Sequence, residues 1–127
     1  MESKATADAY VAGASEFRNN LVHTNTAGAF YRGDAAAIAV ITAAAIQAKA
    51  ESEGCITLAT ADDAQLTAPY YSTAPNFLPK TGSPALTGAS FAGMSSFFTA
   101  TGTFRGAMGT ANWTANWTNW DPQNKAY

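Results

Sequence analysis

The sequence has little charge and few of the side chains on which catalytic and metal sites depend. Of its 127 residues, 13% are charged, and it holds one histidine and one cysteine. Soluble domains usually carry about 25% charged residues. One imidazole and one thiol supply neither a zinc ligand set nor a thiolate cluster. We therefore expect no metal, no cofactor and no enzymatic activity.

Basic residues and long apolar runs are also scarce. Lys and Arg together number 7, and the formal net charge is −2. Recognition of nucleic-acid phosphates needs clustered basic side chains, so we expect no nucleic-acid partner. The sequence holds no uninterrupted apolar run of about eighteen residues, the length that a membrane-spanning helix needs. We therefore expect no membrane insertion, and a single domain over residues 1–127.

The polar surface must come from uncharged side chains. Ser, Thr and Asn recur from Thr24 to Asn124. Because such a neutral polar surface is commoner on secreted proteins, we expect an extracellular or cell-surface location. The first residues, Met1–Lys4, lack the basic and apolar regions of a signal peptide. An exported chain would then be a mature form whose signal has been removed.

The clearest predicted element is an alanine-rich helix over residues 34–53. Asp34 is suited to accept hydrogen bonds from the first-turn amides as the N-cap, and Gly54 is suited to end the helix. One broad face of this helix carries its larger apolar side chains, Ile38, Ile41 and Ile46. We expect the helix to pack along a β body through that face.

Short strands are predicted before and after this helix. The Asn19-Asn20 pair is typical of a corner between strands, so residues 10–24 are expected to form a strand, a turn and a strand. Alternation over residues 55–58 predicts a short strand that begins with a buried Cys55. The Asp62-Asp63 pair predicts a turn or a single helical turn, and Pro and Gly then predict a loop-rich region.

Several segments resemble the C-terminal end of secreted bacterial right-handed parallel β-helix proteins. These segments are APNFLPKTGSPAL at 74–86, FRGAMG at 104–109, NWT at 112–114 and WTNWDP at 117–122; EFRNN at 16–20 is similar to the coil motif of that family. Asn116 departs from the glycine usual at its position, and few coils could precede this ending. The resemblance implies a mainly β fold, a short solenoid end with one Ala-rich helix and a loop-rich cap. Its regions would be 1–33 (β coil), 34–53 (helix) and 54–127 (β and loop with a Trp-rich cap).

The residues that could carry chemistry have structural interpretations that we favour. His23 lies in a Leu-Val-His-Thr stretch, where we expect a hydrogen-bonded structural residue and not a catalytic base. The Arg32-Gly33-Asp34 tripeptide matches an integrin-binding motif, but Asp34 is expected to cap the helix. Asp62-Asp63 hints at the calcium-binding clusters of β-helix lyases and is better explained as a turn.

The tryptophans Trp113, Trp117 and Trp120 have the most functional promise. Exposed indoles form stacking platforms for sugar rings or partner side chains, whereas buried indoles would close the end of a solenoid. We favour burial of Trp113 and Trp117, with Trp120 reaching solvent. These three side chains are our predicted partner or glycan contacts.

Two functional hypotheses follow. The first is a structural or interaction module that associates with itself, as a homo-oligomer or fibre, because a solenoid end exposes an unpaired edge. The second is a carbohydrate-binding module that uses the tryptophans to bind a surface polysaccharide. A lyase of the β-helix type is a distant third.

Overall fold

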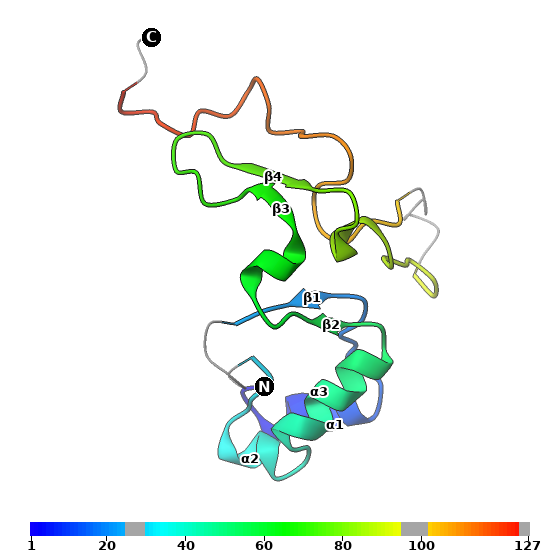
Figure 1. The fold of residues 1–127 in the computed structure, drawn as a ribbon. Coiled ribbons are helices and arrows are strands. Elements are labelled where there is room, and N and C mark those ends of the chain that lie inside the picture. The colour runs from blue at the N-terminus through cyan, green and yellow to red at the C-terminus, as the bar shows by residue number, and fades with distance from the viewer. Residues whose placement is uncertain (25–29, 95–101, 125–127) are drawn as a thin grey trace. The chain divides into compact units, whose positions relative to one another are not determined.

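The computed structural model describes residues 1–24, 30–94 and 102–124 (Figure 1). The chain divides into two compact units, residues 1–61 and residues 62–127, and the expectation that they form a single domain stays a prediction. The elements are α1 (Lys4–Val11), β1 (Leu21–Val22), α2 (Ala35–Ile38), α3 (Ala43–Ser52), β2 (Ile56–Thr57), the 3₁₀ turn η1 (Ala61–Ala64), β3 (Leu66–Ala68), β4 (Asn76–Pro79) and the 3₁₀ turn η2 (Pro84–Leu86).

The predicted mainly β solenoid end is wrong. The strands of the described residues form two separate sheets of two strands each, β1 with β2 and β3 with β4. A parallel solenoid needs each strand to pair with the coil above and the coil below, so that strands stack in continuous ladders. Here the one parallel pair, β1 with β2, extends over two residue pairs, Leu21 with Ile56 and Val22 with Thr57. The described residues hold no stack of coils.

The N-terminal region, predicted as β over residues 1–33, begins instead with a helix. The Ser3 side chain accepts a hydrogen bond from the Thr6 amide (3.2 Å) and caps α1. Lys4 and Asp8, one turn apart, form an exposed ion pair of 2.7 Å. The helix lies against α2, and Ala7 is fully buried. Its short Ala side chains allow this close approach.

The predicted helix over residues 34–53 forms as two helices, α2 and α3. Asp34 caps the first as expected, because its Oδ1 accepts from the Ala37 amide at 2.7 Å. Thr42 then caps the second, with its Oγ1 accepting from the Ala45 amide at 3.2 Å. Val40 and Ile41 precede Thr42, and β-branched side chains favour helix less than Ala does. A threonine that can cap a new helix therefore interrupts the old one.

Gly54 terminates helix α3 two residues after its last residue, Ser52, as the sequence predicts. The Gly54 amide donates to the Glu51 carbonyl (3.1 Å), and the Cys55 amide donates to the Ala50 carbonyl (3.0 Å). These two hydrogen bonds define a Schellman motif, in which the first residue past the helix is left-handed. Gly54 has φ +87°, a conformation that glycine adopts at little energetic penalty.

The turn at Gly54 places Cys55 in the core. The buried cysteine expected at the start of a strand is therefore confirmed. Cys55 is 5% exposed, and its Sγ lies 3.3 Å from the Phe17 carbonyl oxygen. The Ile56 amide donates to the Asn20 carbonyl at 2.8 Å, which begins the β1–β2 ladder. The two strands thus hold the segment after α1 beside the segment after α3.

The core of the first unit collects side chains from α1, α3 and β1 and from the segments that precede α2 and β2. Its buried members are Tyr10, Val22, Tyr31, Ile46, Ala50 and Cys55. Ile46 is 6% exposed, whereas Ile38 and Ile41 are partly buried and pack against this cluster. The expected apolar face therefore docks, but against a small mixed core and not a β body.

The second unit is built from a hairpin and long loops. Strands β3 and β4 are antiparallel, with Leu66 opposite Pro79 and an irregularity before Ala68. The turn η1 confirms the helical turn predicted at Asp62-Asp63. Among the described residues of this unit, few side chains are buried; they are Ser83, Ala85, Met108 and Thr114. Hydrogen bonds to loop backbone, more than apolar packing, must therefore hold the described part of this unit together.

Ser83 provides the clearest test of that conclusion. It is 4% exposed, and its Oγ donates to the Ala64 carbonyl (2.7 Å) while accepting from the Ala85 amide (3.1 Å). Replacing Ser83 with Ala should destabilise the second unit by about 1–2 kcal/mol, because both backbone groups lose a buried partner. Urea unfolding should show a lower midpoint with an unchanged slope. Ser72→Ala, at an exposed site, is the matched control, and equal midpoints for the two variants would refute this role.

Candidate functional site

A tight turn over residues 112–118 presents two of the three tryptophans. The Asn112 Oδ1 accepts from both the amide (3.1 Å) and the Oγ1 (2.6 Å) of Thr114, which is 8% exposed. Asn116 has φ +74°, a left-handed conformation that asparagine tolerates better than most residues. The side chain of Asn112 therefore organises the turn. The Asn-x-Thr spacing was the available sequence signal for it.

The Trp113 and Trp117 rings stack on each other. Their ring centroids lie 5.8 Å apart with an interplanar angle of 24°. Both indole N–H groups donate to backbone carbonyls, Trp113 to Ala107 (2.9 Å) and Trp117 to Trp113. Because the polar edge of each indole is already paired, the rings offer mainly their apolar faces to a partner.

The expectation that Trp113 and Trp117 are buried is wrong. Trp113 is 52% exposed and Trp117 is 69% exposed. Among residues 62–94 and 102–124 few side chains are buried, and these described residues enclose no apolar layer that could receive two indoles. The rings cover part of each other instead, and they leave an apolar surface open to solvent.

Trp120, expected to be the most exposed of the three, is the least exposed at 39%. Its ring packs edge-to-face on Phe77 of β4, with centroids 5.8 Å apart. This contact fixes the chain just after the tryptophan turn onto the hairpin. The structure therefore brings Trp113 and Trp117 together as one surface and places Trp120 beside the hairpin.

The turn that carries the tryptophan pair is polar and uncharged. Residues 110–120 contain Thr, Ala, Asn and Trp only, so the turn holds no acidic or basic side chain. Amide and hydroxyl groups hydrogen-bond without requiring a charged partner. The arrangement of stacked aromatic faces beside neutral hydrogen-bonding groups, which we call the tryptophan surface (Trp113 and Trp117), suits a neutral partner.

His23 has the structural role expected for it. Its ring Nδ1 lies 3.2 Å from the Leu58 carbonyl oxygen, at the end of the β1–β2 ladder. A histidine that donates from Nδ1 to a backbone carbonyl is held in one orientation by the fold. The hydrogen bond supports the structural interpretation.

Asp34 of the Arg32-Gly33-Asp34 tripeptide is engaged as a helix cap. Its carboxylate holds the Ala37 amide, and the Arg32 carbonyl accepts from the Met1 ammonium at 2.5 Å. The tripeptide thus forms the entry to α2. This supports the preference for a cap over an adhesion motif.

The acidic residues of the described ranges do not gather. Within residues 1–24, 30–94 and 102–124, no group of three or more His, Cys, Asp or Glu side chains is placed to hold a metal ion. Asp62 and Asp63 lie in η1, where they are exposed. The expectations of no metal, no cofactor and no enzymatic activity stay predictions.

Comparisons with known proteins identify no relative. No protein-family model, no curated protein and no solved structure matches the chain. The resemblance of residues 74–86 and 104–122 to β-helix endings therefore stays a hypothesis drawn from the sequence. Among the described residues, none of the helices has the length and apolar character needed to cross a membrane.

Proposed function

We propose that this chain is a non-catalytic extracellular binding module whose tryptophan surface binds a neutral polysaccharide. The observation that carries the proposal is the exposed, stacked pair Trp113 and Trp117, with 52% and 69% of their surfaces open. Soluble proteins seldom expose large adjacent aromatic rings without a partner. Sugar rings present flat C–H faces that pack on indole faces, and their hydroxyls suit amide and hydroxyl neighbours.

The uncharged turn favours a neutral glycan over an acidic one. A uronic-acid polymer would need cationic side chains to offset its desolvation, and residues 110–120 contain none. Glycans of β-1,4-linked glucose, xylose or N-acetylglucosamine combine neutrality with flat sugar faces. We therefore expect binding within this class.

The test uses soluble xylan, hydroxyethylcellulose and chitin oligosaccharides with the full chain. Binding should shift tryptophan emission to the blue and protect it from quenching, because a sugar would cover the exposed faces. Trp117→Ala should weaken binding about tenfold or more, since a central tryptophan contact often dominates binding energy. Affinity electrophoresis and calorimetry would measure the change.

Tyr70→Ala is the matched control, because Tyr70 is an exposed ring (72%) in the same unit but outside the pair. It should leave binding within about twofold of the parent, as expected for a contact outside the site. A Tyr70→Ala loss equal to that of Trp117→Ala would count against the tryptophan surface. Unchanged emission with every one of these glycans would refute the carbohydrate proposal.

The second candidate is self-association through the same tryptophan surface. Its earlier basis, the open end of a solenoid, no longer applies, but two exposed indoles also suit an apolar contact between copies. Light scattering separates the two candidates. A monomer across a wide concentration range favours the glycan, whereas assembly that Trp117→Ala abolishes favours the homo-oligomer or fibre.

A further inference from the structure

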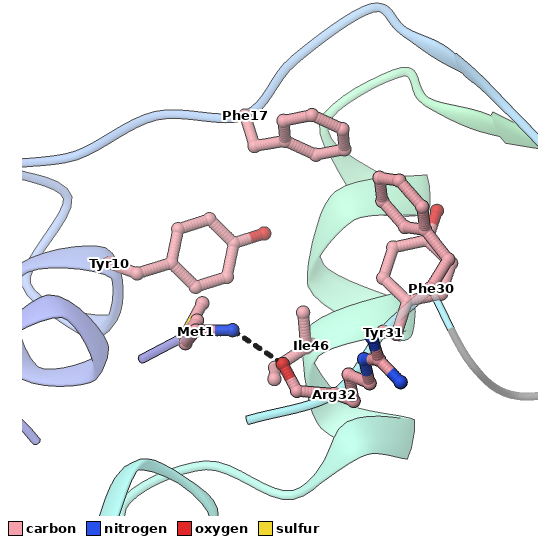
Figure 2. A pocket seen from close by; sticks show the side chains of 7 residues that line it. All are labelled: Met1, Tyr10, Phe17, Phe30, Tyr31, Arg32 and Ile46. Atoms are coloured by element: carbon pink, nitrogen blue, oxygen red, sulfur yellow. Dashed lines mark hydrogen bonds between the residues drawn. The ribbon is translucent and has the colours of Figure 1, made fainter. Parts of the chain in front are cut away.

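The first unit holds an apolar pocket of about 220 Å³ next to its core (Figure 2). Its lining residues are Met1, Tyr10, Phe17, Phe30, Tyr31, Arg32 and Ile46. They come from the N-terminus, from α1, from α3 and from the segments that follow α1 and precede α2. No spacing in the sequence marks this set, because the fold collects it from separate elements.

The aromatic side chains give the pocket flat walls. The Phe17 and Phe30 ring centroids lie 5.9 Å apart, and Phe30 meets Tyr31 edge-to-face at 5.2 Å. Phe30 keeps 47% of its surface exposed, which places it at the edge of the pocket, whereas Tyr31 is 5% exposed. A planar ring is the shape that such walls accommodate best.

The Tyr10 hydroxyl is a buried polar group at this pocket without a partner among the described residues. Tyr10 is 3% exposed, and its Oη is buried without a hydrogen bond to any described residue. In Figure 2 this hydroxyl points toward the side chains of Phe17, Phe30 and Ile46. Burial, and then the negative charge of Glu53, raise the pKa of Tyr10 to about 12, so the group stays a neutral donor. An unpaired buried donor is unfavourable, and a ligand oxygen would relieve it.

We propose that this pocket binds a small, neutral aromatic compound whose oxygen accepts a hydrogen bond from Tyr10 Oη. The size agrees, because a protein cavity of about 150 Å³ holds benzene, and 220 Å³ adds room for a short substituent. The mainly apolar lining favours an uncharged compound, because a buried charge without a partner is unfavourable. The site lies in residues 1–46 and shares no residue with the tryptophan surface.

The experiment compares acetophenone with α-methylstyrene, a compound of the same shape that lacks the carbonyl oxygen. NMR titration of the full chain should shift the resonances of Tyr10, Phe17 and Ile46 with both compounds. Acetophenone should bind about five- to tenfold more tightly, the typical net effect of one hydrogen bond. If neither compound moves these resonances, or if both bind equally, the proposal is overturned. Tighter binding of benzoate than of acetophenone would overturn the neutral ligand class.

Tyr10→Phe isolates the hydroxyl while keeping the ring. This variant should bind the two compounds within about twofold of each other, because the donor is gone. It should also unfold at the same or a higher denaturant concentration than the parent, since it removes an unpaired buried group. Tyr70→Phe, at an exposed ring, should keep the preference for acetophenone. A preference that persists in Tyr10→Phe would show that Tyr10 does not contact the ligand.

Ile46→Phe is a second variant, which fills the pocket instead of removing its donor. This variant should bind neither compound, whereas Trp117→Ala should bind both as tightly as the parent does. Undiminished acetophenone binding by a folded Ile46→Phe chain would place the ligand elsewhere and overturn the assignment.

Discussion

Replacing Ala50 with Asp should unfold most of the first unit at 25 °C. Ala50 lies in α3 with no exposed surface, and it belongs to the buried cluster with Tyr10, Val22 and Cys55. A carboxylate there has neither room nor a solvating partner, and such a substitution costs about 3–5 kcal/mol. A unit of this size has a total stability of similar magnitude.

Ala48→Asp is the matched control, because it makes the same substitution at an exposed position of the same helix. Only the lower helix propensity of Asp should matter there, about 0.5 kcal/mol. Far-ultraviolet circular dichroism and the dispersion of amide resonances would report the difference. Equal unfolding midpoints for the two variants would mean that α3 is not packed through Ala50.

Gly54→Ala should destabilise the first unit by about 2–3 kcal/mol. Gly54 is left-handed (φ +87°), and a Cβ built there would lie 2.4 Å from Asn19 Oδ1. The substitution therefore combines backbone strain with a steric clash at the junction of α3 and the β1–β2 pair. Thermal or urea unfolding would measure the loss.

A substitution of Gly13 separates backbone strain from the steric clash. It also follows a helix with the two hydrogen bonds of a Schellman motif, from Gly13 to Tyr10 (3.2 Å) and from Ala14 to Ala9 (2.8 Å). It is left-handed (φ +75°), but a Cβ there would meet no atom within 4 Å. Gly13→Ala should therefore lower the free energy of unfolding by about 1 kcal/mol, the effect of backbone strain without a steric clash.

A substitution of Asn19 tests whether the steric clash accounts for the rest of the stability that Gly54→Ala loses. Asn19 is itself left-handed (φ +58°), so Asn19→Gly keeps the backbone and removes the clashing oxygen. In a double-mutant cycle, Gly54→Ala should be about 1–2 kcal/mol less harmful in the Asn19→Gly background. Purely additive effects would contradict a clash between these two residues.

The proposed sites were accessible from the sequence to different degrees. Trp113, Trp117 and Trp120 stand out as residues, because indoles are rare and cluster near the end of the chain. Their exposure did not follow from the sequence, since it depends on how much apolar surface the rest of the unit encloses. The pocket at Tyr10 was not predicted at all, because its walls come from several elements.

Short-range chemistry explains the predictions that held. Asp34 caps α2, Gly54 ends α3 and Asp62-Asp63 starts a 3₁₀ turn, because a cap or stop depends on backbone groups a few residues away. The short strand after Gly54 and the buried Cys55 follow from the same local pattern. These features were determined by the sequence alone.

Tertiary structure decided what depends on distant partners. Whether residues 1–33 stack as coils or begin with a helix rests on whether neighbouring strands exist to pair with, and here α1 packs on α2 instead. The alanine-rich segment breaks at Thr42, where a cap that starts α3 competes with continued helix. The tryptophans stay exposed because few side chains are buried in the described part of the second unit. Each outcome depends both on the local conformational preference of a segment and on its contacts with distant parts of the chain. The sequence indicates the local preference, whereas the distant contacts are seen only in the folded structure.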